Sequence, residues 1–139
     1  MRDIKFRVWN SSSKEYISNN FVYMSPNGEL LFAPILSKPN LYKQVSDILD
    51  GENIVERWTG LKDKNDKDIY EGDICSFTSK TGKHVGTVEW LDDLAGFGLR
   101  MIKNNFLYTF SELDTMGINL DTLEVVGNIR ENPEFLEEK

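Results

Sequence analysis

The segment WTGLKDKNDKDIYEGDI, from Trp58 to Ile74, holds the densest group of side chains that could bind a metal ion. An EF-hand calcium loop needs oxygen ligands at alternate positions, a glycine at the sixth position and a glutamate at the twelfth. In a loop that begins at Asp63, the fifth position is Lys67, a cation where a ligand is needed. The sixth and twelfth positions are Asp68 and Ile74. The ligand pattern therefore excludes a calcium site of this kind.

The centre of the same segment, Lys62 to Asp68, is interpreted instead as the turn of a β-hairpin. Asn and Asp tolerate left-handed backbone and hydrogen-bond to their own main chain, so Asn65-Asp66 suits the tip of such a turn. Charged residues on both sides of the tip would keep an exposed strand connection from pairing with other chains. We therefore expect a structural role for these residues.

Four further carboxylates could support acid–base catalysis or hold a metal ion, namely Glu71, Asp73, Asp92 and Asp93. Their spacing matches no metal-binding or hydrolase motif, so a carboxylate-based hydrolase is kept only as a minor alternative. Gly72 accepts positive φ, and the stretch around it is interpreted as a sharp turn or bulge where a strand enters a sheet. No catalytic residue is predicted.

Cys75 and His84 are the only cysteine and the only histidine of the chain. A zinc site built from Cys and His ligands within one chain is therefore excluded. A Cys-His nucleophilic pair has no supporting motif around either residue. We expect Cys75 to be a small buried hydrophobic residue in a strand, and His84 to lie in a solvated turn. No metal ion and no cofactor are predicted.

Three tryptophans, Trp9, Trp58 and Trp90, each stand at the end of a predicted strand. Such side chains supply contact area in protein interfaces and can stack on nucleobases. Buried aromatic residues also dominate small cores, and packing within the protein is the interpretation that we favour. The three tryptophans nevertheless are the candidate partner-binding residues of this chain.

The composition is that of an ordinary folded protein. The 139 residues are 40% hydrophobic and 12% aromatic, which suffices for one domain with a real core. No apolar run approaches the length of a membrane span and no leader opens the sequence, so we expect no membrane association. A single cysteine agrees with a reducing compartment, and a cytoplasmic location is expected.

The net charge of −7 is distributed unevenly. Residues 1–57 carry seven basic and seven acidic side chains, whereas residues 58–139 carry nine basic and sixteen acidic ones. An acidic surface repels phosphate backbones, so general binding to DNA or RNA is disfavoured. Two nucleic-acid hypotheses stay open, namely imitation of DNA by the acidic half and binding through Arg2, Lys5 and Arg7 near Trp9.

The elements that must position these residues are mainly β-strands. Most segments alternate apolar and polar residues with a period of two, and turn residues separate them. Residues 1–57 are expected to form a lobe of β-hairpins, with strands near residues 4–8, 21–24 and 30–33. A turn is predicted at Asn10–Ser13. One short helix is expected where a single stripe is formed by Leu41, Val45, Ile48 and Leu49.

Residues 58–139 are expected to form a small SH3-like β-barrel. The predicted strands are residues 69–78, 83–91, 95–101, 106–110 and 123–130. A helical turn is predicted near Ser111, before the last strand, and another near Pro133. Closure of a barrel would also hide its strand edges. Because no linker separates the lobe from the barrel, the two are expected to pack as one compact unit.

Three stretches of this chain stand in a recognisable order and spacing: RDIKFRVWN at residues 2–10, the segment at residues 58–74, and VVGNIRENPE at residues 125–134. Together they resemble the YopX family of small phage and prophage proteins. The resemblance implies a phage or prophage product in a bacterial cytoplasm, mainly β and oligomeric, with no assigned reaction. Family members often carry Asn-Gly, the pair favoured in type I′ hairpins, where this chain has Asn65-Asp66.

The leading functional hypothesis is a non-enzymatic accessory protein of a phage or prophage. It would associate with itself and act by binding a host or phage protein. The alternatives are a nucleic-acid-binding or DNA-mimicking protein that acts on host DNA-binding factors, and the carboxylate-based hydrolase.

Overall fold

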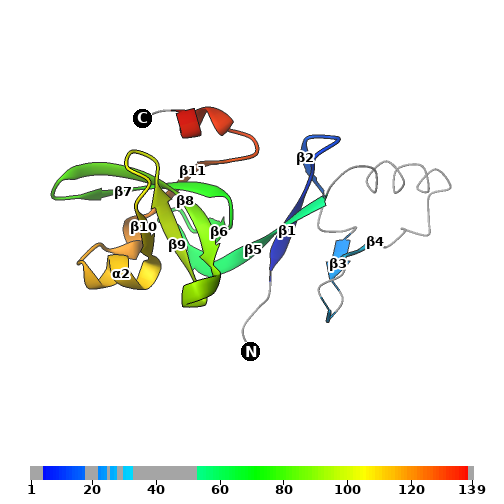
Figure 1. The fold of residues 1–139 in the computed structure, drawn as a ribbon, viewed down its shortest axis with the longest axis horizontal. Helices are drawn as coiled ribbons and strands as arrows, with labels where there is room; N and C mark the ends of the chain where they lie inside the picture. Colours follow the sequence, from blue (N-terminus) through cyan, green and yellow to red (C-terminus); the bar gives the residue numbers. More distant parts are fainter. Residues whose placement is uncertain (1–4, 18–21, 25, 28–29, 33–52, 138–139) are drawn as a thin grey trace. The chain divides into compact units, whose positions relative to one another are not determined.

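The structure is a computed structural model that describes residues 5–17, 22–24, 26–27, 30–32 and 53–137 (Figure 1). The chain divides into two units, which are considered separately. Phe6–Glu56 form the N-terminal unit, and Met1–Lys5 together with Arg57–Lys139 form the C-terminal unit. The predicted division at residue 57 and the packing of both parts as one unit stay predictions.

The N-terminal unit is built from short antiparallel strands. They are β1 (Phe6–Asn10), β2 (Glu15–Ile17), β3 (Val22–Met24), β4 (Leu30–Phe32) and the first residues of β5 (Asn53–Lys62). β1 pairs with β2, and β3 pairs with β4 as the predicted second hairpin. The helix predicted from Leu41 to Leu49 lies outside the described residues.

The predicted turn at Asn10–Ser13 is confirmed, and the side chain of Asn10 organises it. Asn10 is buried, and its Oδ1 accepts hydrogen bonds from the backbone N–H groups of Ser12 and Ser13 at 3.1 and 2.8 Å. Its Nδ2 donates to Oδ1 of Asn53 at 2.8 Å. One polar side chain thus ties the β1–β2 turn to the start of β5.

The C-terminal unit contains a five-stranded antiparallel sheet in the order β10-β9-β8-β7-β11. Its strands are β7 (Asp73–Ser79), β8 (Gly82–Leu91), β9 (Gly96–Met101), β10 (Leu107–Thr109) and β11 (Glu124–Asn128). β5 and β6 (Asp68–Tyr70) form an additional hairpin. Every strand predicted in this half is therefore present, with bounds that differ by a few residues.

Short helical segments connect the strands of the C-terminal unit. They are η2 (Asp92–Leu94), α2 (Phe110–Thr115), η3 (Leu120–Thr122) and η4 (Pro133–Glu137). Figure 1 shows α2 beside β9 and β10, which it contacts. The helical turns predicted near Ser111 and Pro133 are confirmed by α2 and η4. Among the described residues, no helix has the length and hydrophobicity of a membrane-spanning segment.

Alternating side chains of the sheet form one hydrophobic core in the C-terminal unit. Val88 of β8 and Leu99 of β9 are paired on neighbouring strands, so their side chains lie next to each other on one face of the sheet, and both are fully buried or nearly so. The other buried members are Ile69, Cys75, Phe77, Met101, Phe110, Leu113 and Leu123. The period-two pattern of the sequence is the physical cause, because every second side chain of a strand faces the same side.

The predicted fold class is confirmed, since the described chain is mainly β and its antiparallel sheets include a curled half-barrel. The curled sheet has the strand number and the helical turn before its last strand that the SH3-like prediction requires. This curvature creates concave surfaces where loops and α2 meet the sheet, and these surfaces are the places to search for a site.

Candidate functional site

The charged loop, Lys62–Asp68, is a hairpin turn that is organised around the carboxylate of Asp63. Oδ1 of Asp63 accepts hydrogen bonds from the backbone N–H groups of Asn65 and Lys67, at 2.8 and 2.9 Å. Oδ2 accepts the backbone N–H of Val125 on β11 at 2.9 Å. Asp63 is only 6% exposed. Its carboxylate oxygens are therefore occupied by main-chain donors within the protein, in agreement with the predicted structural turn.

The electrostatics of Asp63 follow from these contacts. Burial by itself raises the pKa of a carboxyl group, but the hydrogen bonds from Val125, Lys67 and Asn65, with the charge of Lys67, hold the pKa of Asp63 below its usual value. The loop is also attached through its main chain, because the N–H of Lys64 donates to the carbonyl of Leu123 at 2.8 Å. Asp63 thus remains ionised and fastens the hairpin to β11.

The tip of the charged loop adopts the expected left-handed backbone. Asp66 has φ of 66°, a conformation that glycine would adopt without strain. The remaining charges form peripheral ion pairs, at 3.7 Å between Lys62 and Asp66 and at 2.8 Å between Lys64 and Glu124. These pairs are solvent-exposed and contribute little to stability.

The carboxylates of Glu71 and Asp73 also accept hydrogen bonds from groups within the protein. Oε1 of Glu71 accepts from the guanidinium of Arg57 at 2.8 Å, and Oε2 accepts the Arg57 backbone N–H at 2.9 Å. Asp73 is buried and its Oδ2 accepts the N–H of Tyr70 at 2.8 Å. Between them Gly72 has φ of 83°, as the predicted turn requires.

Asp92 and Asp93 lie on the exposed η2 segment and are not joined to the first carboxylate pair. Oδ1 of Asp92 accepts the indole N–H of Trp90 at 2.6 Å. Within the part of the chain that the structure describes, no group of three His, Cys, Asp or Glu side chains has a metal-binding arrangement. The structure therefore adds no support to the hydrolase alternative.

Cys75 and His84 lie on neighbouring strands with different surroundings. Cys75 is fully buried in the core, as expected, and burial raises the pKa of its thiol, which disfavours the thiolate form that a nucleophile needs. His84 belongs to β8 and is half-buried, so its expected place in a solvated turn is wrong. Its ring stacks on Phe77 with centroids 5.1 Å apart. The strand predicted over residues 83–91 already included this residue, and β8 confirms it.

The three candidate tryptophans have different environments. Trp9 belongs to the N-terminal unit, is 8% exposed, and packs edge-on against Tyr16 at 5.0 Å. Trp58 is half-buried, with the ammonium of Lys5 over its ring at 4.5 Å. Trp90 is half-buried, with the guanidinium of Arg57 over its ring at 4.8 Å. Each ring is thus packed within its own unit.

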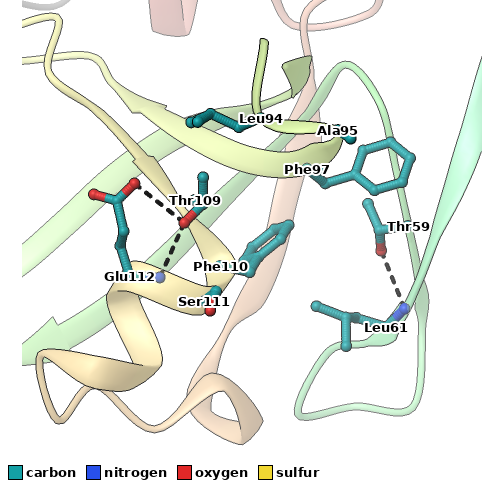
Figure 2. Close-up of a pocket in the computed structure, with 10 residues that line it drawn as sticks. Thr59, Leu61, Leu94, Ala95, Phe97, Thr109, Phe110, Ser111 and Glu112 are labelled. Atoms are coloured by element: carbon teal, nitrogen blue, oxygen red, sulfur yellow. Dashed lines mark hydrogen bonds between the residues drawn. The ribbon is translucent and has the colours of Figure 1, made fainter. Parts of the chain in front are cut away.

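A concave apolar surface of about 510 Å³ lies next to two of these tryptophans, and we call it the Leu94 groove (Figure 2). Its lining residues are Thr59, Leu61, Leu94, Ala95, Gly96, Phe97, Thr109, Phe110, Ser111 and Glu112. They come from β5, from η2 and the start of β9, from the end of β10 and from the start of α2. Leu94 lies beside the cavity and is 60% exposed, as one of four large exposed apolar side chains among the described residues.

The β5 wall of the Leu94 groove is fixed by a bulge. The pairing register of β5 with β6 shifts between Trp58 and Lys62, and Gly60 within the bulge has φ of 89°. The hydroxyl of Thr59 donates to the carbonyl of Ile69 at 2.8 Å and accepts the N–H of Leu61 at 3.1 Å, a contact that Figure 2 shows. The bulge thereby holds Leu61 in the groove wall.

The opposite wall is the first turn of α2. Thr109 caps this helix, because its hydroxyl accepts the N–H of Glu112 at 3.0 Å (Figure 2). The ring of Phe110 is buried in the core, whereas Ser111 and Glu112 are exposed. A capped helix end and a hydrogen-bonded bulge make both walls well defined.

Trp58 and Trp90 each contact a residue that lines the Leu94 groove. The indole N–H of Trp58 donates to the carbonyl of Leu61 at 3.1 Å. Trp90 packs edge-on against Phe97 with ring centroids 4.9 Å apart. The candidate tryptophans therefore position two lining residues, Leu61 and Phe97. Leu94 itself was not predicted from the sequence, where its place between Asp92-Asp93 and Ala95-Gly96 was the only indication.

The edge of the Leu94 groove is acidic. Glu112 lines it, and the exposed Asp92 and Asp93 directly precede Leu94. The groove thus combines an apolar floor with negative charge, an arrangement that favours a ligand with an apolar anchor beside positive charge.

The cations near the start of the chain are engaged within their own units. Lys5 pairs with Asp68 at 3.2 Å in addition to its contact with Trp58. Arg7 pairs with Glu56 at 2.9 Å and lies over the ring of Tyr16. Arg2 lies outside the described residues. These contacts give no support to phosphate binding at this end of the chain.

Comparisons with known proteins identify relatives along nearly the whole chain. The family model described as "YopX protein" matches residues 5–137. No curated protein matches the chain significantly.

Two solved structures are similar in fold. Protein EF1440 from Enterococcus faecalis has a TM-score of 0.56 and 22% sequence identity, with 98% of this chain and 99% of that chain covered. Protein yopX from Bacillus subtilis has a TM-score of 0.56 and 18% identity, with the same coverage. At these identities the likeness concerns the fold alone.

Proposed function

Because this chain belongs to the YopX family, we propose that it is a phage or prophage accessory protein that acts by binding another protein rather than by catalysis. We place it in the cytoplasm of a bacterial host. The observation that carries the proposal is the Leu94 groove, an apolar concave surface with an exposed leucine and two walls that are held by hydrogen bonds.

The walls of the Leu94 groove support a binding role because they are preorganised. The Thr59 hydroxyl fixes the β5 bulge, Thr109 caps α2, and Trp90 packs behind Phe97. A surface that is already ordered loses little conformational freedom when a partner binds. When a partner covers Leu94, most of the apolar surface of this side chain is removed from water, and this favours binding.

The acidic edge defines the chemistry of the partner segment. Asp92, Asp93 and Glu112 favour a segment with one apolar side chain for the groove and Lys or Arg residues next to it. Such charges increase the association rate and make it dependent on salt. The same charges disfavour an acidic partner and a phosphate backbone.

The experiment compares Leu94→Glu with Leu136→Glu in affinity capture from the host bacterium. Leu136 is also exposed, at 47%, but does not line the groove, so its variant controls for the loss of surface hydrophobicity. A partner that acts through the groove is retained by the wild type and by Leu136→Glu and is lost by Leu94→Glu. Equal capture by all three proteins would contradict the proposal.

Self-association is the second part of the proposed function. We expect size-exclusion chromatography with light scattering to give a mass above that of one chain. A monomer over the whole concentration range would make this part wrong without affecting the groove. If Leu94→Glu leaves the oligomer intact, self-association and partner binding use different surfaces.

A further inference from the structure

Two adjoining cavities lie beside the β7–β8 hairpin and share no residue with the Leu94 groove. The inner chamber has a volume of about 230 Å³ and the outer chamber about 720 Å³. Both are lined by Thr81, His84, Met101 and Asn104, and they adjoin across these residues. The two chambers differ in chemistry, as their linings show.

The inner chamber is walled mainly by apolar side chains, namely Phe77, Met101, Tyr108, Leu113, Met116 and Ile118. Phe77, Met101 and Leu113 are buried members of the core, whereas Met116 is 59% exposed. A partly open apolar cavity of this kind favours an apolar ligand group, because binding removes that group from water.

A cluster of hydrogen-bonding groups stands where the chambers meet. Nε2 of His84 lies 2.8 Å from the hydroxyl of Ser79 and 2.9 Å from that of Thr81, and the two hydroxyls are 2.9 Å apart. Oδ1 of Asn104 accepts the N–H of Phe106 at 3.0 Å, which leaves its Nδ2 amide as a donor. The hydroxyl of Thr81 and this amide can both donate to an anionic oxygen.

The charged side chains of the outer chamber are both cationic. Lys83 of β8 and Lys103 of the β9–β10 turn line it, and neither forms an ion pair within the described part of the chain. The protein has a net charge of −7, whereas the two exposed lysines make the charge around this cavity positive. They favour an anionic head group.

We propose that the two chambers form a binding site for a small amphipathic carboxylate. The apolar body of the ligand occupies the inner chamber. Its carboxylate lies at the junction, accepts hydrogen bonds from Thr81 and Asn104, and is attracted by Lys83 and Lys103. This site is independent of partner binding in the Leu94 groove, so either proposal can fail alone.

Octanoate is the probe that tests the site, with octanol and octylammonium as matched ligands of the same chain length. Titration of the isotope-labelled full chain is followed through the backbone amide resonances of Thr81, His84 and Asn104. We expect saturable shifts with octanoate, weaker shifts with octanol and none with octylammonium. Equal effects of all three compounds, or no shift with octanoate up to its solubility limit, would overturn the proposal.

Charge variants test the role of the lysines. Lys83→Gln and Lys103→Gln should each weaken octanoate binding about twofold to fivefold, since each removes one exposed attraction. Lys80→Gln is the matched control, because Lys80 is exposed on the same hairpin but lines neither chamber. If Lys80→Gln weakens binding as much as Lys83→Gln, the attraction is a general effect of charge and the site is wrong.

A variant of the inner chamber tests where the apolar body lies. Met116→Glu places a charge in the apolar wall at an exposed position, so the fold should tolerate it. We expect it to reduce octanoate binding at least tenfold. Leu94→Glu, at a position of similar exposure in the other groove, should leave octanoate binding unchanged. Unchanged binding by Met116→Glu would contradict the proposed orientation.

Discussion

The charged loop and the Leu94 groove belong to the same unit of the protein but use their side chains in opposite ways. In the loop, Asp63 is 6% exposed and its two oxygens accept three backbone hydrogen bonds. In the groove, Leu94 is 60% exposed although it is large and apolar. The polar residue is therefore a structural element of the interior, and the apolar residue is available on the surface.

A high density of charged residues along a sequence is therefore a poor guide to a binding site. Neighbouring lysines and aspartates in the loop pair with one another or with the main chain, so few of their groups are available to a ligand. A hydrogen-bonding group that is already satisfied within the protein gains little from a ligand. The feature that points to a binding surface is an exposed apolar side chain that lines a cavity.

Asp63→Ala tests most directly whether the charged loop has a structural role. The backbone N–H groups of Asn65, Lys67 and Val125 would lose their acceptor, and we expect the free energy of unfolding to fall by about 3 kcal/mol. Urea denaturation followed by tryptophan fluorescence measures it. Asp66→Asn, in the same loop, is the control and should change stability by less than about 0.5 kcal/mol, because Asn also tolerates positive φ. A loss below about 1 kcal/mol for Asp63→Ala would show that water replaces the carboxylate.

Acidification should remove part of the same stabilisation. The folded-state pKa of Asp63 is lowered, so its contribution is complete above the usual aspartate pKa of about 3.9 and is lost as the pH falls from there through the folded-state value. Asp63→Asn has no carboxyl group to titrate. In either orientation of the amide, its NH2 group faces a backbone N–H group, which then has no acceptor. The stability difference between wild type and Asp63→Asn should therefore narrow as the pH falls below the usual aspartate pKa of about 3.9. A constant difference over this range would mean that Asp63 is not ionised in the folded protein.

Asp66→Gly should act in the opposite direction. Asp66 has φ of 66°, a conformation that costs most L-residues about 1–2 kcal/mol and glycine very little. After allowance for the greater freedom of glycine in the unfolded chain, we expect a gain of about 0.5 kcal/mol in the free energy of unfolding. Lys64→Gly, in the same loop, relieves no left-handed strain and should not increase the free energy of unfolding. A loss of stability with Asp66→Gly would mean that the aspartate side chain supports the turn.

The sequence was sufficient for those parts of the molecule that local patterns determine. Strict alternation predicted β8 and β9, and the residue types at the hairpin tip predicted the left-handed Asp66. The contact between Asp63 and Val125 joins residues 62 positions apart, so no local pattern contains it. The Leu94 groove likewise combines β5, β9 and α2. Its surface exists only after the sheet has curled, which explains why the tryptophans were found and the groove was not.

Leu94→Ser should have the smallest effect on stability, and it tests whether Leu94 is dispensable for the fold. Because Leu94 is largely exposed, its replacement should change the free energy of unfolding by less than about 0.5 kcal/mol. Leu99→Ala, on the adjacent strand and fully buried, is the contrasting variant and should cost about 2–5 kcal/mol. Urea denaturation of both proteins under one set of conditions measures the difference. If Leu94→Ser were destabilising by more than about 1 kcal/mol, Leu94 would be part of the packing of the C-terminal unit. A neutral result together with lost partner capture by Leu94→Glu would assign the exposed leucine to binding, just as the cost of Asp63→Ala assigns the charged loop to the fold.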